Sequence, residues 1–175
     1  MGFRPRGTEP PSPPEVHPAE GLPDISVDVT PGQFSRNVFL AMAQERAGGA
    51  VYVPPDAVPT LHEVGDDMDL VHANMLLIRA SRWLETLERQ LVIAEVAHLL
   101  AKDAYERLNE RAKFVYKSST RFPAEVRDSL AAARDAAVEL KAQLLVHKGT
   151  KASLQKVHTA ASRTITRYKS LTNNT

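Results

Sequence analysis

The stretch that decides the fold is residues 70–115, LVHANMLLIRASRWLETLERQLVIAEVAHLLAKDAYERLNERAKFV. This stretch contains fourteen positions that are alternately three and four residues apart. Thirteen of them are apolar or aromatic. The fourteen positions are Leu70, Ala73, Leu77, Ala80, Leu84, Leu87, Leu91, Ala94, His98, Ala101, Tyr105, Leu108, Ala112 and Val115. This spacing gives a helix one continuous apolar stripe, so the sequence predicts a single long helix. Asp66, Asp67 and Asp69 supply the negative charge that a helix N-terminus favours.

A second stripe with the same spacing follows the break at residues 118–123, SSTRFP. Its members are Val126, Leu130, Ala133, Ala137, Leu140, Leu144, His147, Lys151, Leu154, His158, Ala161, Ile165 and Tyr168. Pro123 suits an early position of the second helix, with Ser119 or Thr120 as its cap. Two helices joined by so few residues fold back on each other, over a length of about 70 Å. We therefore expect an all-α fold, a long antiparallel helical hairpin that resembles a coiled coil and oligomerises.

The front of the chain has a different composition, because eleven of the twelve prolines precede residue 60. Residues 1–33 are acidic and rich in proline, which predicts a disordered or extended arm. Residues 34–65 are expected to form a short amphipathic helix and a linker, with Gly48 and Gly49 ending the helix. The apolar side of that helix is predicted to carry Phe34, Val38, Ala41 and Met42. Residues 66–175 then form the helical hairpin with its basic C-terminal segment.

Several functional classes are disfavoured by what the sequence lacks. There is no cysteine, which excludes disulfides and cysteine-ligated zinc and fits a reducing compartment. No uncharged apolar stretch approaches 18 residues and no secretory pattern is visible at the start, so we expect a cytoplasmic protein without a membrane span. No nucleophile–base set, carboxylate pair or phosphate loop occurs in a supporting context, which predicts a non-catalytic protein without cofactors. His98, His147 and His158 fall on the apolar stripes and are interpreted as core histidines rather than metal ligands.

Charge is strongly segregated although the formal net charge is only +1. Residues 1–69 carry 11 acidic and 4 basic residues, whereas residues 141–175 carry 7 basic residues and no acidic one. On a helix, Lys156, Arg163 and Arg167 lie opposite the apolar stripe, and Lys148, Lys151 and Lys169 extend the positive surface. A phosphate backbone would suit these charges. The alternatives are a solvated face and a face covered by the acidic front of the chain.

A second basic group surrounds the expected tip of the hairpin. It comprises Arg111, Lys113, Lys117 and Arg121, interleaved with the aromatic residues Phe114, Tyr116 and Phe122. The aromatic rings either stack on nucleic-acid bases or close the end of the hairpin, and the sequence leaves both interpretations open.

Residues 91–100, LVIAEVAHLL, are apolar almost all round a helix. A two-helix hairpin buries only one side of such a segment, so a further neighbour is required. The sequence therefore predicts self-association through Leu91, Val92, Ile93, Val96, Leu99 and Leu100.

Three runs in the second helix resemble the C-terminal half of the phage UvsY-type recombination mediators. They are residues 138–144 (VELKAQL), 154–157 (LQKV) and 162–167 (SRTITR), and residues 114–117 (FVYK) are similar to the tip of that family's first helix. The resemblance covers about residues 70–170. It implies a helical oligomer that binds single-stranded DNA and helps a RecA-like recombinase displace a single-strand-binding protein. The alternative is a structural protein of a phage particle whose extended front reaches its neighbours.

Overall fold

The computed structural model describes residues 29–65, 67–117 and 122–172, and within these ranges the chain contains helices and no strand. Two short 3-10 helices, η1 (Pro31–Phe34) and η2 (Leu61–Glu63), flank the helix α1 (Arg36–Arg46). Two long helices follow, α2 (Leu70–Tyr116) and α3 (Ala124–Thr172). The prediction of an all-α fold is confirmed, and the three α-helices pack together.

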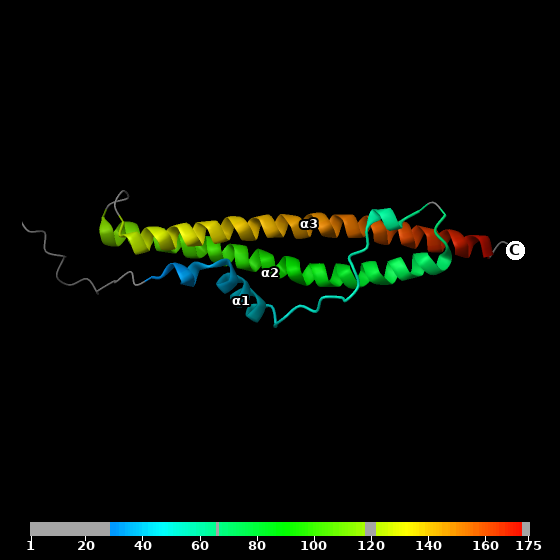
Figure 1. Cartoon of the computed structure of the whole chain (residues 1–175), viewed down its shortest axis with the longest axis horizontal. Coiled ribbons are helices and arrows are strands. Elements are labelled where there is room, and N and C mark those ends of the chain that lie inside the picture. Colours follow the sequence, from blue (N-terminus) through cyan, green and yellow to red (C-terminus); the bar gives the residue numbers. More distant parts are fainter. Residues whose placement is uncertain (1–28, 66, 118–121, 173–175) are drawn as a thin grey trace, which may run out of the picture.

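The long helices α2 and α3 lie side by side along their length and run in opposite directions (Figure 1). Just past the middle of α2, Ala97 shares a cluster with Leu140 of α3, and near the start of α2 Leu76 shares one with Ala161. Residue numbers therefore rise along one helix as they fall along the other. This pair forms the rod on which every other element packs.

The buried residues follow the two predicted stripes. Of the first stripe only Leu70 is exposed, and of the second only Tyr168. Leu140 and Leu154 are completely buried between the helices, and many of their neighbours are alanines, which let the two backbones approach closely. The buried face of α2 is nevertheless wider than one stripe, because Leu76 and Ile93 are also buried. The additional coverage comes from α1 and from the segment that follows it.

The ends of the long helices have local causes. The Asp69 carboxylate accepts a hydrogen bond of 2.7 Å from the backbone N–H of His72 and caps α2. Lys117 has a φ of +47° and ends α2 in the left-handed region. Pro123 lies directly before α3, where its carbonyl accepts from the N–H of Arg127 at 3.0 Å, so it precedes the helix by one residue instead of lying within it. The predicted caps Ser119 and Thr120 lie outside the described residues.

The face on which α1 packs differs from the predicted one. Phe39 and Ala43 are buried against Ala97 of α2 and Leu140 of α3, whereas Met42 is 40% exposed. The prediction that Met42 and Ala41 belong to the packed side is therefore wrong, because the packing direction is set by Phe39. Gly48 and Gly49 end the helix with φ of +87° and +107°, as the sequence predicts.

Residues 31–33, which the sequence assigns to the extended arm, belong to η1. The side-chain oxygen of Gln33 accepts from the N–H of Thr30, and Arg36 donates to Gln143 of α3 at 2.9 Å. The packed part of the chain thus includes residues before 34. Residues 1–28 of the predicted arm lie outside the described residues.

Candidate nucleic-acid interface

The outer face of α3 carries a row of exposed basic side chains. They are Lys148, Lys156, Arg163 and Arg167, whereas the exposed Lys169 follows Arg167 by two residues and therefore lies on another side of the helix. The row extends over about 30 Å at 1.5 Å per residue. None of these five side chains forms an ion pair or a side-chain hydrogen bond with any residue in the described ranges. Their charge is available to an anionic ligand.

A rigid support holds this row in place. The opposite side of the same helix buries Leu154, Val157 and Ile165 against α2. Because the inner side is fixed by packing, the spacing of Lys156 and Arg163, seven residues apart, is fixed at about 10 Å. A shallow groove follows this face, lined by Ala152, Gln155, Lys156, Thr159, Ala160 and Arg163. Small side chains between the two cations leave room for a ligand backbone.

Lys151 does not belong to the row. Its ammonium group pairs with the Glu88 carboxylate of α2 at 3.0 Å, and its side chain is 29% exposed. The prediction that Lys151 extends the ligand-binding surface is therefore not supported by its position, because its charge is answered by the neighbouring helix.

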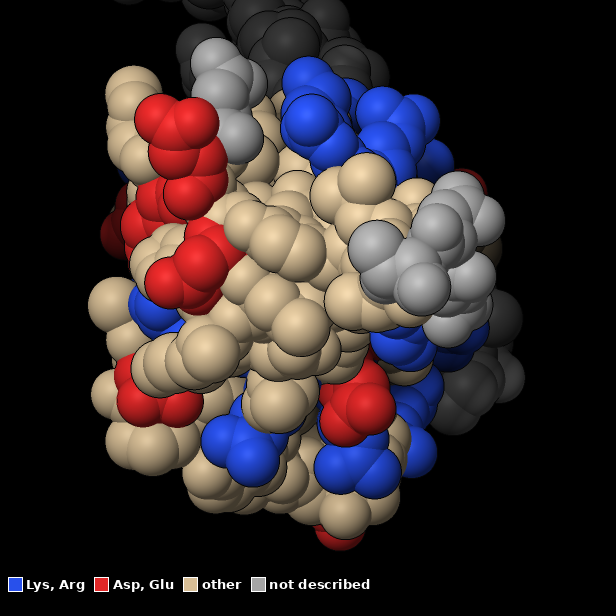
Figure 2. Space-filling model, turned by 90° about the vertical axis from the view of Figure 1, so that its right-hand side faces the viewer, with Lys and Arg blue, Asp and Glu red and all other residues tan. Residues whose placement is uncertain are grey.

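Figure 2 looks at the end of the molecule where α3 finishes and α2 begins. Lys and Arg side chains gather mainly on one side of this end, and Asp and Glu side chains mainly on the other. Arg163, Arg167 and Lys169 are the basic residues of the last turns of α3, whereas Asp67 and Asp69 lie just before α2. An anionic strand on the basic side consequently meets little negative charge.

The tip of the pair lies at the opposite end of the rod, so the structure does not bring the two predicted basic groups together. The rings of Tyr116 and Phe122 are 6.1 Å apart and inclined at 55°, so they pack on each other across the connection. This contact agrees with the interpretation in which the aromatic residues close the end. Lys113, Lys117 and Phe114 are exposed, and Arg121 lies outside the described residues.

The apolar segment 91–100 finds its second neighbour within the chain. Ile93 is 5% exposed and, with Val96 and Leu100, belongs to the cluster that includes Phe39 of α1. Leu91 is half-buried. The prediction that all six residues await another copy is therefore wrong for Ile93. Val92 and Leu99 remain 54% and 57% exposed.

The histidines on the stripes have ordinary structural surroundings. The Nδ1 atom of His98 lies 2.9 Å from the carbonyl oxygen of Ala137 on the facing helix. His147 contacts Gln143 at 3.3 Å, and burial lowers its pKa below the usual value. In the described part of the chain, no three histidine, aspartate or glutamate side chains gather as a metal site would require.

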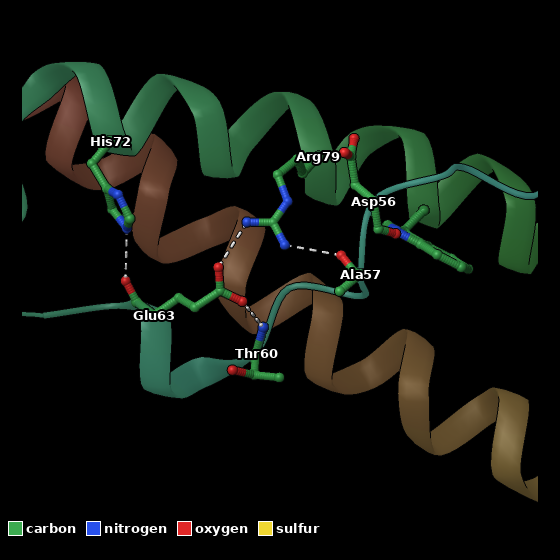
Figure 3. A network of polar contacts seen from close by, with 7 residues as sticks. Asp56, Ala57, Thr60, Glu63, His72 and Arg79 are labelled. Carbon is green, nitrogen blue, oxygen red and sulfur yellow. Dashed lines mark hydrogen bonds and ion pairs between the residues drawn. The ribbon is translucent and has the colours of Figure 1, made fainter.

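A strap formed by residues 50–63 runs along α2, and the sequence did not predict the polar contacts that hold it. Side chains of α2 bind its backbone carbonyls in order: Thr86 donates to Tyr52 at 3.1 Å and Trp83 to Asp56 at 3.0 Å. Arg79 donates to Ala57 at 2.9 Å and pairs with Glu63 at 2.7 Å (Figure 3). The apolar stripes do not predict these contacts, because Arg79, Trp83 and Thr86 lie between the stripe positions.

The end of the strap is fixed by the carboxylate of Glu63. It accepts from the backbone N–H of Thr60 at 2.9 Å as well as from Arg79 (Figure 3). These donors, the backbone N–H foremost, hold the pKa of Glu63 below its ordinary value. The spacing Thr60-x-x-Glu63 is that of a capping box and is the one signal from which this turn could have been predicted.

Comparison with known proteins adds no relative, since the sequence matches no family model and resembles no curated protein or solved structure significantly. Of the helices in the described ranges, none combines the length and the apolar character needed to span a bilayer.

Proposed function

We propose that the protein is a non-catalytic single-stranded-DNA-binding protein whose basic α3 face holds the phosphate backbone. The observation that carries this proposal is the row formed by Lys148, Lys156, Arg163 and Arg167, which is exposed and lacks intramolecular ion pairs among the described residues. Residues 141–175 contain no carboxylate side chain that would neutralise it. Counterion release from the strand supplies the affinity of such a contact.

The arrangement favours one strand over a duplex. The cations form a single row along one helix, which follows one phosphate backbone, whereas a duplex offers two backbones across a groove. Contacts of this kind position the strand without reading its sequence. Exposed Phe114 at the tip offers one ring on which an unpaired base can stack.

In its specific form, the proposal is a recombination mediator that helps a RecA-like recombinase displace a single-strand-binding protein. The resemblance to the UvsY-type mediators supports this role, and the helical fold is compatible with it. Several copies on one strand would add their weak contacts, because each further contact becomes intramolecular.

A salt titration tests the binding proposal. Fluorescence anisotropy of a labelled thymidine oligonucleotide is measured with the full chain at several salt concentrations. We expect binding that weakens with salt, with a slope of about −0.7 for each phosphate contacted. Absence of binding at low salt would overturn the proposal.

A structural role in a phage particle remains the second candidate, favoured by exposed apolar residues on the outer side of α3. Val138 and Leu145 are 64% and 60% exposed and lie seven residues apart on one face. A rod that packs laterally against neighbours would bury them. Finding the chain in stoichiometric amounts in purified particles, with no salt-dependent binding to DNA, would favour this candidate.

A further inference from the structure

The side of α2 that faces away from α3 carries a second heptad series that no element within the described residues covers. Its members are Val71, Ile78, Glu85, Val92 and Leu99. The four apolar members are 69%, 54%, 54% and 57% exposed in this order. Met75, 58% exposed, lies beside them. We call this surface the outer seam of α2.

The outer seam has its charged residues in the middle and apolar residues at both ends. Arg82, Glu85 and Arg89 occupy the centre, between Ile78 on one side and Val92 on the other. The side chains of these three residues are exposed and make no ion pair or hydrogen bond within the described ranges. The outer seam thus has at its centre positive and negative side chains without partners among the described residues, and apolar side chains at its ends. Such a surface is complementary to a second surface with the same pattern.

We propose that the outer seam binds a second copy of this chain, with the two α2 helices antiparallel and a two-fold axis passing near residue 87. In this arrangement Glu85 of each copy faces Arg89 of the other, so the contact forms twice. The exposed apolar residue Leu99 then faces the exposed Met75 of the second copy, again twice. A parallel pair in register would place Glu85 on Glu85 and Arg89 on Arg89, which is repulsive.

A groove of about 710 Å³ opens on the same surface. It lies between α2 and the residues Ala47–Tyr52, and Arg82, Glu85, Arg89 and Val92 form part of its lining. The second copy lies across this groove. The proposal does not depend on DNA binding, because the basic row belongs to α3 and the outer seam to the opposite side of α2.

Charge reversal tests both the interface and its orientation. Sedimentation velocity of the full chain at micromolar concentration should show a dimer for the parent. Glu85→Arg and Arg89→Glu should each weaken dimerisation by at least about tenfold, because each places two like charges together twice. The chain carrying both changes should regain the dimer, since the reversed pair attracts again.

The charge-reversal experiment needs a check of folding and a control variant. Circular dichroism should show the same helix content for all variants, because the changed side chains are exposed and do not belong to the core. A control with Val138→Asp and Leu145→Asp, on the outer face of α3, should leave the dimer intact. A monomeric parent would overturn the proposal. It would also be overturned if neither single charge reversal changed dimerisation, because that is the result expected for a parallel pair of helices.

Discussion

Arg79 of α2 and Glu63 of η2 form an ion pair of 2.7 Å that joins the strap to the rod. Both side chains are partly buried, at 25% and 31% exposure, and each binds a backbone group of the strap as well. The strap therefore depends on a network rather than on one exposed pair, and such networks contribute more than isolated surface pairs.

Replacing Arg79 should detach the end of the strap. Arg79→Met leaves the Glu63 carboxylate and the Ala57 carbonyl without this donor, which should lower the free energy of unfolding by about 1–2 kcal/mol. Urea unfolding followed by circular dichroism measures the change. Lys102→Ala serves as the control, because its pair with Glu106 is 3.8 Å long and well exposed, and we expect a change within about 0.5 kcal/mol. Equal effects of the two changes would contradict the network.

The packing face of α1 gives a second prediction. Phe39→Ala removes a side chain that is 4% exposed and touches both long helices, so it should cost about 3 kcal/mol or more. Met42→Ala, on the side that the sequence pattern favours, should cost less than about 1 kcal/mol because Met42 is 40% exposed. Urea unfolding of both variants distinguishes the faces, and a larger loss for Met42→Ala would refute the observed docking of α1.

A buried hydroxyl gives a third prediction. Ser129 of α3 is fully buried, and its Oγ has no hydrogen-bond partner among the described residues. Ser129→Ala removes an unsatisfied polar atom at little cost in volume, so it should leave stability unchanged or raise it by about 1 kcal/mol. Ala133→Ser, one turn further at another fully buried position, is the matched control and should destabilise. Loss of stability in Ser129→Ala would show that its hydroxyl is satisfied in solution.

The lowered pKa of His147 gives a prediction about pH. Because the folded pKa lies below the ordinary value of 6.5, the unfolded chain binds more protons in the interval between them. The free energy of unfolding should therefore fall as pH is lowered through that interval. Urea midpoints at about pH 7.5 and about pH 5.5 should differ less for His147→Gln than for the parent. The same pH dependence in both proteins would rule out this role of His147.

The rod was predictable because its signal is repeated. Positions such as Ala80, Leu87 and Leu154 recur at helix spacing over nearly fifty residues, and each repeat points to the same buried side. The helix ends at Asp69 and Gly48 were predictable for a different reason, since capping and positive φ favour particular residues.

The strap and the docking of α1 were not predictable in the same way. Both depend on single contacts between segments far apart in sequence, such as Trp83 with Asp56 or Phe39 with Leu140. The same limit applies to Lys151, whose position on the second stripe does not show which side chain lies opposite it. Its ion pair with Glu88 depends on the facing helix and forms only after the helices have paired.

The central claim, that the outer face of α3 holds single-stranded DNA, is tested most directly by comparing two triple variants. The first variant changes Lys156, Arg163 and Arg167 to Ala. These three side chains are exposed and lie outside the core. The second variant changes Lys102, Arg107 and Arg134 to Ala. These three side chains form ion pairs with Glu106, Asp103 and Asp135, respectively. Both remove three positive charges, so general electrostatic attraction falls equally.

The measurement is the slope of log affinity for a thymidine oligonucleotide against log salt concentration. The account predicts that the first variant binds more weakly and that its slope is shallower by about 0.7 for each lost contact, hence about 2 in total. The second variant should keep the parent's slope. Equal slopes for the parent and the first variant, or an equal loss in both variants, would contradict the α3 interface.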